Sequence, residues 1–174
     1  MKKILLFSDT HGWFDEALDS HCNWADEIWH AGDWGTDVYE RLQRYAKPIR
    51  GVYGNIDGPP IRGQFPLLTH FTCEGVHVGM THIAGTPGRY KPDARQLLTE
   101  GRPDVLICGH SHILRVERDP NYQNMLFMNP GAAGKEGFHR IMTALRFKVS
   151  DGRIFDVEVL ELGKRGKIPD NFTA

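Results

Sequence analysis

The sequence predicts an α/β domain in which two mixed β-sheets are flanked by helices, and two observations carry this prediction. In the first half of the chain, apolar strand-like runs alternate with helical stretches, which is the pattern of a parallel sheet with right-handed crossovers. In the second half strand-like runs dominate, and the dipeptides Glu74-Gly75 and Asp151-Gly152 are typical of hairpin turns between antiparallel strands.

The first half is expected to form three strands separated by two helices. Apolar runs at residues 3–8, 27–31 and 48–53 read as strands, because each is short and ends in a polar or glycine-rich turn. Residues 14–23 and 36–45, which lie between them, are expected to be helical.

The second half is expected to form strands around one helix. Residues 93–100 are the helical stretch. Because hairpin turns join some of the strands, we expect the later strands to pair antiparallel. The predicted strands are residues 67–73, 76–81, 105–108, 114–118, 125–128, 140–149 and 153–162.

Length and composition indicate one domain, residues 1–162, followed by a flexible tail at 163–174. The chain has 174 residues, of which 40% are hydrophobic and 25% charged, and a chain of this kind can bury a substantial core. The sequence carries no internal repeat or low-complexity segment. Lys, Arg and Gly are frequent in the last residues, a composition typical of a mobile terminus.

Composition also argues against several classes of function. The formal net charge is −1, so no overall positive field gathers nucleic acid or an anionic membrane. The apolar run at residues 4–7 is too short for a signal peptide or a membrane span. Cys22, Cys73 and Cys108 include no C-x-x-C pair, which predicts small buried residues in a reducing cytosol rather than disulfides or a thiolate zinc site. We therefore expect a cytoplasmic protein.

Residues of the metal-ligand type follow most of the predicted strands. Loops beyond the carboxyl ends of strands are where folds of this class place their sites, so we expect these side chains to meet. The candidates are Asp9 and His11 in SDTHG, Asp33 in HAGDWG, Asn55 and Asp57 in VYGNIDG, His82 in GMTHIAG, and His110 and His112 in CGHSH.

The i, i+2 spacing of Asp9 with His11 and of His110 with His112 has a physical reason. In an extended backbone both side chains of such a pair point to the same side, so that a pair can reach one metal ion or two adjacent ones. Glycines stand directly before several ligand-type residues, where the backbone can turn sharply and come close to an ion.

Each motif alone is weak evidence, but the ordered set D-x-H, G-D, G-N-x-D, H and G-H-x-H is specific for a metal centre. Mixed carboxylate, amide and imidazole ligands suit manganese, iron, cobalt or zinc. Calcium would require more oxygen ligands, and a structural zinc site would require thiolates.

From ILLFSDTHG through HAGDWG, VYGNIDG, THIAG, ICGHSH and MNPGAAG to the closing strands, the sequence resembles the calcineurin-like metallophosphoesterases. Within that family it is similar to the small phosphodiesterases of the YfcE type. The resemblance implies a four-layer α/β/β/α sandwich with two divalent metal ions, manganese first and iron, zinc, cobalt or nickel as alternatives. It implies one metal held by Asp9, His11, Asp33 and His112, and another held by Asp33, Asn55, His82 and His110, with Asp33 as the bridge.

Two divalent ions roughly 3.5 to 4 Å apart bind phosphoryl oxygens, lower the pKa of a bridging water and stabilise an in-line displacement. The resemblance therefore implies that this chain hydrolyses a small phosphodiester with a metal-bridging hydroxide, and that the seven ligands are its catalytic residues. A phosphomonoesterase is the first alternative. A scaffold like the retromer subunit of the same fold is the second, which the intact ligand set disfavours. Relatives are commonly dimers or tetramers, so a homo-oligomer is also implied.

Ile56 departs from the pattern of the family. Most metallophosphoesterases carry a histidine at this position, which is credited with stabilising the transition state or protonating the leaving group. Isoleucine can do neither, so the proton donor stays unassigned. Asp57 could replace it, but a turn residue whose side chain points away from the metals is the preferred interpretation.

Other residues keep two interpretations each. His30 either orients a ligand or packs in its strand. Trp34, next to Asp33, is a candidate wall of the pocket, whereas Trp13, Trp24 and Trp29 are expected in the core or at an oligomer interface. Arg89 and Lys91 either contact a phosphate or lie in a solvated loop. Histidines outside any motif are expected to be structural or at the surface; they are His21, His70, His77 and His139.

Overall fold

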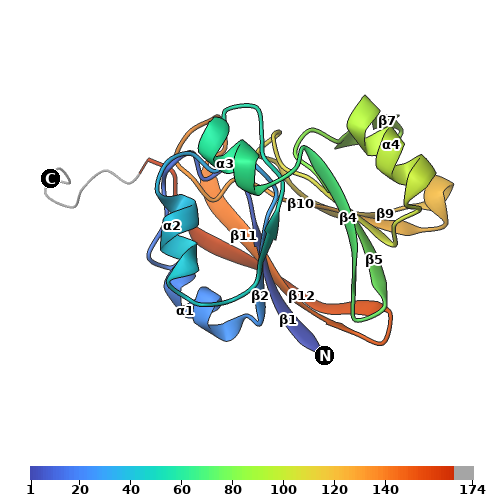
Figure 1. Cartoon of the computed structure of the whole chain (residues 1–174), viewed down its shortest axis with the longest axis horizontal. Coiled ribbons are helices and arrows are strands. Elements are labelled where there is room, and N and C mark those ends of the chain that lie inside the picture. Colours follow the sequence, from blue (N-terminus) through green and yellow to red (C-terminus); the bar gives the residue numbers. More distant parts are fainter. Residues whose placement is uncertain (167–174) are drawn as a thin grey trace, which may run out of the picture.

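A computed structural model, which describes residues 1–166, contains two mixed five-stranded sheets packed face to face (Figure 1). This is the predicted α/β class. The elements in chain order are β1 (Lys2–Phe7), α1 (Leu18–Trp24), β2 (Glu27–His30), α2 (Val38–Gln43), β3 (Ile49–Gly51), α3 (Pro59–Gln64), β4 (Leu68–Cys73), β5 (Val76–Thr81), β6 (Gly85–Thr86), β7 (Arg89–Tyr90), α4 (Pro92–Glu100), β8 (Val105–Ile107), β9 (Leu114–Asp119), a 3-10 turn (Pro120–Tyr122), β10 (Met125–Pro130), β11 (Ile141–Ser150) and β12 (Arg153–Lys164).

The strand order of the first sheet is β12-β11-β1-β2-β3 and that of the second is β4-β5-β8-β10-β9. β1, β2 and β3 pair parallel, as the alternating pattern predicts. The hairpins β4–β5 and β11–β12 are antiparallel. The expectation that all later strands pair antiparallel is wrong, because β8 pairs parallel with both β5 and β10. Helix α4 gives the chain a crossover between β5 and β8, and the chain passes through the edge strand β9 before β10 returns beside β8.

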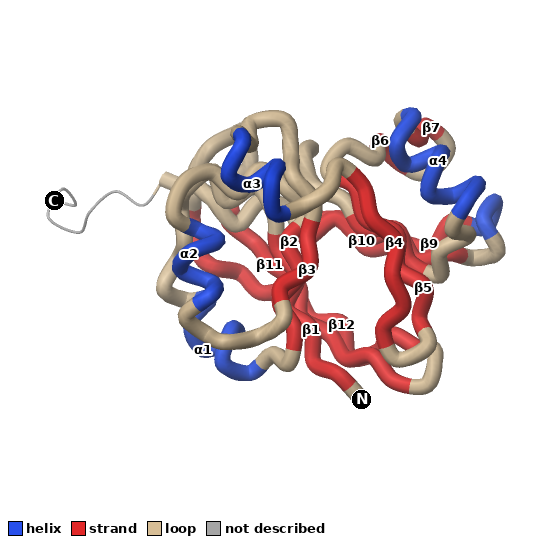
Figure 2. The backbone as a smooth tube through the Cα atoms, in the orientation of Figure 1, coloured by secondary structure: helices blue, strands red, loops and turns tan. Residues whose placement is uncertain are grey.

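Side-chain alternation along β1 explains the four layers. Leu5 and Phe7 pack on the side of α1 and α2, whereas Ile4 and Leu6 point to the second sheet. On the far side of that sheet, Leu97 of α4 packs in a third cluster. Figure 2 shows the result, with α1 and α2 outside one sheet and α4 outside the other. The predicted α/β/β/α sandwich is confirmed.

Several predicted boundaries are wrong. Helix α3 was not predicted, because its sequence PPIRGQ is typical of a turn, although prolines are well tolerated in the first turn of a helix. Helices α1 and α2 are shorter than predicted. The tail does not begin at residue 163, since Gly163 and Lys164 pair with β11. Residues 167–174 of the predicted tail lie outside the described part of the chain.

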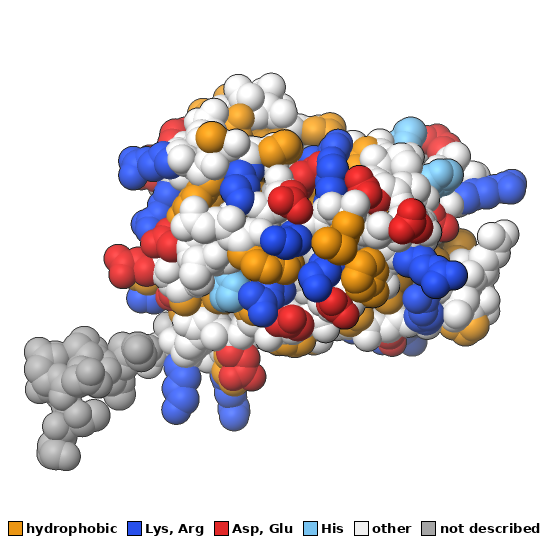
Figure 3. Space-filling view, turned by 90° about the horizontal axis from the view of Figure 1, so that it is seen from below, with side chains coloured by type: hydrophobic (Ala, Val, Ile, Leu, Met, Phe, Trp, Pro, Cys, Tyr) orange, Lys and Arg blue, Asp and Glu red, His pale blue; other side chains and the backbone are white. Residues whose placement is uncertain are grey.

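Surface and core agree with the composition. The three cysteines are free and buried. Figure 3 shows the face seen from below, where Lys and Arg side chains are interspersed with Asp and Glu, as the small net charge suggests. Within the described residues, none of the helices is long and apolar enough to cross a bilayer.

Candidate metal centre

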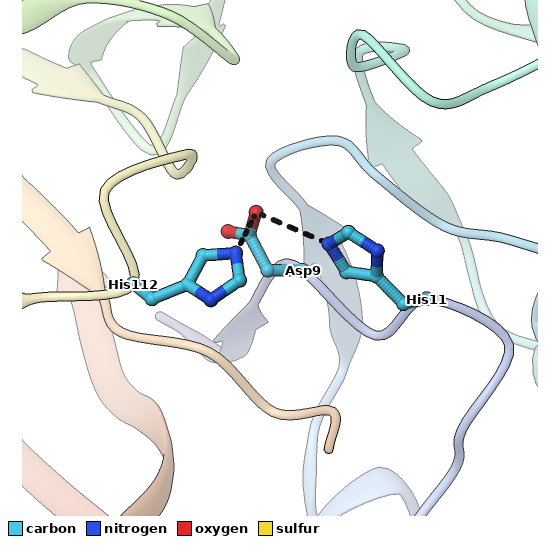
Figure 4. A group of neighbouring side chains, drawn as sticks. All are labelled: Asp9, His11 and His112. Atoms are coloured by element: carbon cyan, nitrogen blue, oxygen red, sulfur yellow. Dashed lines mark ion pairs between the residues drawn. The ribbon is translucent and has the colours of Figure 1, made fainter. Parts of the chain in front are cut away.

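The carboxyl ends of β1, β2, β3, β5 and β8 bring the predicted ligands together at one end of the two sheets. Because β1–β3 are parallel and β5 is parallel to β8, the loops that follow these strands meet. Two groups of side chains result, and within each the ligand atoms lie within 4.8 Å of one another. The groups are Asp9, His11 and His112, drawn in Figure 4, and Asp33, His82 and His110.

A left-handed backbone, not an extended one, aims these side chains. Five of the candidate ligands have φ between 46° and 68°, a region that few non-glycine residues occupy. The expectation that each i, i+2 pair shares a side because its backbone is extended is therefore wrong. Backbone strain of this kind is concentrated at functional sites, where surrounding contacts maintain it. The five residues are Asp9, His11, Asp33, His110 and His112.

Glycines make room for the ligand side chains themselves. A Cβ atom on Gly54 would lie 2.0 Å from Oδ1 of Asp33, and one on Gly109 would lie 2.6 Å from Oδ2 of Asp9. Neither position can carry a side chain without moving a candidate ligand. The glycines of the G-N and G-H motifs thus serve the close approach of a carboxylate.

Asp33 lies between the two groups. Its Oδ2 is 3.4 Å from Nε2 of His11 and 3.2 Å from Nε2 of His82. Its Oδ1 accepts a hydrogen bond from the backbone N–H of Ile56 at 3.0 Å, which fixes the orientation of the carboxylate. One oxygen atom therefore faces an imidazole of each group, the position of a bridging ligand.

His139, which no sequence motif marks, contacts the first group. Its Nδ1 is 3.2 Å from Nδ1 of His112, and its Nε2 is 2.8 Å from the carbonyl oxygen of Gly134. A carbonyl oxygen only accepts, so Nε2 of His139 donates and the Nδ1 of the neutral ring accepts from His112. The Nε2 atom of His112 then presents a lone pair to Oδ1 of Asp9, 3.1 Å away.

The same reasoning applies to His82, whose Nδ1 lies 2.7 Å from the carbonyl oxygen of Ala31. Its Nδ1 donates, so its Nε2 turns a lone pair towards Asp33. Two acceptors this close in a buried site repel each other unless a cation lies between them. Among the described residues, Oδ1 of Asp9, Nε2 of His11 and Nε2 of His82 are buried without a hydrogen-bond partner. This donor set fits divalent metal ions.

The charges of the site favour a cation as well. Burial opposes a charge on His82, but attraction from Asp33 and Asp9 outweighs it and raises the pKa of the imidazole. Burial likewise opposes ionisation of Asp33, yet contact with His82 lowers the pKa of the carboxyl group. The carboxylates therefore stay ionised and stabilise positive charge beside them, which suits a metal ion.

With this geometry established, the comparison with known proteins is decisive. Residues 1–152 match the model of the calcineurin-like phosphoesterase superfamily domain. The chain belongs to this superfamily. A protein of Mycoplasma pneumoniae named "Probable metallophosphoesterase" is 29% identical over 163 residues, which cover 90% of this chain and 96% of the relative.

Two solved structures share the fold of this chain. A Thermotoga maritima protein determined by NMR has a TM-score of 0.69 at 27% identity, covering 92% of this chain and 99% of that one. Vps29 of Entamoeba histolytica complexed with zinc has a TM-score of 0.68 at 16% identity, again covering 92% and 99%. The second likeness shows the shared fold.

Asn55 and Ile56 occupy the loop after β3 in this phosphoesterase. Oδ1 of Asn55 lies 3.0 Å from Nδ1 of His110, which places the amide beside the second group. Ile56 is 47% exposed, so an apolar side chain stands at the surface next to the candidate metal centre.

Asp57 supports the loops of the candidate metal centre. It is buried; its Oδ1 accepts the backbone N–H groups of Trp34 and Gly35, at 2.9 and 3.1 Å, and its Oδ2 accepts that of Gly54, at 2.7 Å. Both oxygens are thus committed to backbone donors. Asp57 is thus a residue of the turn after β3, as the preferred interpretation has it. Its carboxylate also joins the loops after β2 and β3.

His30 and Trp34 lie behind the phosphoesterase site, in the core. Their rings stack with centroids 3.8 Å apart, and Trp34 is fully buried, so the interpretation in which it walls the pocket is wrong. His30 contacts Oγ1 of Thr10 at 3.0 Å and accepts the N–H of Gly32 at 3.1 Å. It braces the loop backbone, and burial lowers its pKa well below the usual value.

Arg89 and Lys91 sit beside helix α4. Arg89 belongs to β7, and Lys91 is the residue before the first turn of α4. Arg89 lines a cavity of about 320 Å³ together with Arg95 and Tyr122, on the outer side of the second sheet. The structure therefore places Arg89 with this cavity rather than with the candidate ligands.

Proposed function

We propose that the chain hydrolyses small phosphodiesters at a centre of two divalent metal ions, as the YfcE-type phosphodiesterases that it resembles do. The position of Asp33 carries the proposal, because a single carboxylate oxygen faces His11 of one group and His82 of the other. The proposed ligands of the first metal are Asp9, His11, Asp33 and His112, and those of the second are Asp33, Asn55, His82 and His110.

Bound divalent ions lower the pKa of water and withdraw charge from phosphoryl oxygens. The protein's own part is to hold the ligands in place. Hydrogen bonds from Ile56 and from the Nδ1 atoms of His82 and His112 fix the ligand atoms that face inward, and such preorganisation removes the cost of rearranging them during reaction. Asn55 offers a neutral oxygen, which limits the negative charge around the metals.

Manganese is the metal we propose, with iron, zinc, cobalt or nickel as alternatives. Imidazole and carboxylate ligands suit all of these ions. The zinc complex of Entamoeba histolytica Vps29 supports a divalent cation in this fold and keeps zinc among the candidates.

A diester fits the site better than a monoester. A monoester is a dianion at neutral pH and gains from additional positive charge near its phosphoryl oxygens. Ile56 occupies the position where most of the superfamily carries a histidine, so this side chain adds no such charge. A diester carries one negative charge and depends less on the missing group.

The test compares two substrates with one leaving group, p-nitrophenyl methyl phosphate and p-nitrophenyl phosphate, on metal-stripped protein supplied with Mn²⁺. We expect the diester to have the higher kcat/KM, and Asp9→Asn to abolish turnover. The control Asp37→Asn changes an exposed carboxylate and should behave as the parent. Faster hydrolysis of the monoester would identify a phosphomonoesterase, and no turnover with any of the metals would favour a scaffold.

A further inference from the structure

Four exposed apolar residues lie within two positions along the chain of a candidate metal ligand or of His139. Trp13 follows His11 by two residues, and the others adjoin a candidate ligand or, in the case of Phe138, the His139 that contacts one. Their exposed fractions are 39%, 47%, 65% and 103% for Trp13, Ile56, Ile113 and Phe138, respectively. We call these four residues the apolar rim.

Contacts between neighbouring residues connect the loops that carry the rim residues. Since adjacent Cα atoms are about 3.8 Å apart, each rim residue stays close to its anchored neighbour. His139 next to Phe138 contacts His112 next to Ile113 at 3.2 Å. Asn55 next to Ile56 contacts His110 at 3.0 Å.

Further contacts connect the loops of Ile56, Trp13 and Phe138. The N–H of Ile56 is bound to Asp33 at 3.0 Å, and Asp33 lies 3.4 Å from His11, two residues before Trp13. The Nζ atom of Lys135 lies 3.5 Å from the centroid of the Trp13 ring, which connects Trp13 with the loop that carries Phe138.

These four side chains are exposed and do not belong to the hydrophobic core. Single exposed apolar residues are ordinary, but exposed apolar residues on four loops that meet at one polar site favour a binding surface. Each sugar hydroxyl needs a hydrogen-bond partner when it is buried, and the four rim side chains offer only the indole N–H of Trp13. The ammonium group of Lys135 over Trp13 adds a positive charge that suits an anionic ligand.

We propose that the apolar rim binds the organic group of the substrate, and that the substrate is a phosphoester whose group next to the phosphate is aromatic or aliphatic rather than a sugar. This inference rests on the proposed function, which seats the phosphoryl group at the metals. The two ester substituents of a diester then lie against the rim, where burial of their apolar surface favours binding.

Binding tests the proposal without any turnover. The Mn²⁺-loaded protein is titrated with phenylphosphonate and with methylphosphonate, which share the anionic group and differ in apolar surface. We expect phenylphosphonate to bind about tenfold more tightly, and Phe138→Ser or Ile113→Ser to reduce that ratio about three- to tenfold. Phe138→Tyr keeps the ring and should retain the ratio. Val116→Ser alters an exposed aliphatic residue in mid-β9 and is the matched control.

Turnover separates the proposal from the function on which it rests. p-Nitrophenyl phenyl phosphate and p-nitrophenyl methyl phosphate lose the same leaving group, so the ratio of their kcat/KM values reports the other substituent. Hydrolysis of both with equal efficiency, together with equal binding of the two phosphonates, would overturn the rim proposal and leave the phosphodiesterase standing. Preferential binding of phenylphosphonate without hydrolysis would overturn the proposed function and support the rim.

The rim could instead serve contacts between two copies of the chain. Light scattering of the parent, Phe138→Ser and Ile113→Ser proteins decides this point. A mass that falls to that of one chain in the rim variants, with no change in the phosphonate ratio, would identify an interface and overturn the proposal. An unchanged mass with a reduced ratio supports it.

Discussion

The Nδ1 atoms of His112 and His139 lie 3.2 Å apart, and this contact determines which nitrogen of His112 faces the candidate metal. Because His139 donates to the carbonyl oxygen of Gly134, it accepts from His112 and leaves Nε2 of His112 free. Partners of this kind orient a ligand and raise its basicity. His139 is thus a positioning residue for the proposed first metal.

His139→Leu should therefore weaken Mn²⁺ binding about tenfold, within the range for the loss of such a partner. His139→Asn offers a side-chain oxygen to the same N–H and should recover part of the affinity. Calorimetric titration of metal-free protein measures both. His77→Leu, at an exposed position outside the site, is the control. An equal loss of Mn²⁺ affinity in His77→Leu, or no loss in His139→Leu, would contradict the positioning role of His139.

Asp57→Ala should destabilise the metal-free protein. Three backbone N–H groups, of Trp34, Gly35 and Gly54, lose their common acceptor, and unsatisfied buried donors cost about 1–3 kcal/mol each. We expect the free energy of unfolding, measured in urea, to fall by about 3 kcal/mol for Asp57→Ala. It should fall by less for Asp57→Asn, which keeps one oxygen. An Asp57→Ala protein as stable as the parent would show that the loops do not depend on this carboxylate.

Glu27 should make folding sensitive to acid. Burial opposes its ionisation, but hydrogen bonds from Arg50, Lys2 and Trp29 outweigh burial and lower its pKa to about 2. A depressed pKa contributes stability that is present above pH 4.5 and is lost as the pH falls towards 2. The contribution of Glu27 to the free energy of unfolding that is lost in this way should be on the order of 3 kcal/mol. The difference in unfolding free energy between parent and Glu27→Gln, measured from pH 7 to pH 2, should shrink over that interval; a constant difference would contradict the assignment.

Because residue 56 is isoleucine, we expect the rate to depend steeply on the acidity of the leaving group. Without a proton donor at this position, aryl diesters should react readily and alkyl diesters slowly. Ile56→His should accelerate alkyl diesters about tenfold more than aryl ones. This gain lies below the 10²- to 10⁴-fold range of general acids, because both oxygens of Asp57 are bound to backbone groups and cannot orient the new imidazole. Ile56→Gln, polar but not acidic, is the control. Equal acceleration of both substrate classes would show that another residue supplies the proton.

Local sequence patterns predicted much of the fold. The apolar run of β1 and the turns at Glu74-Gly75 and Asp151-Gly152 each depend on neighbouring residues, and such signals are visible in the chain itself. The parallel pairing of β8 depends on which strands meet after a crossover. Helix α3 was missed because two prolines and a glycine outweigh its short helical run.

The candidate ligands could be predicted for a similar reason, since Asp9, His11, His110 and His112 lie in short motifs at strand ends. Their partners could not. His139 meets His112 only because the loop before β11 folds over the site, and Asp57 reaches Trp34 across two loops. Contacts between residues far apart in the chain leave no motif. The left-handed backbone of the ligands was also missed, because it is fixed by the surrounding loops.

The metal content of Asp33→Asn tests the central claim most directly. The substitution keeps the shape of the side chain and removes the charge of the oxygen that faces both His11 and His82. Protein purified with excess Mn²⁺ and then desalted is analysed for bound metal by mass spectrometry, beside Asp37→Asn as the control. We expect close to two manganese ions per chain in the parent and control, and a loss at both positions in Asp33→Asn. Full occupancy in Asp33→Asn, or the loss of a single ion with the other bound as in the parent, would contradict a bridging Asp33.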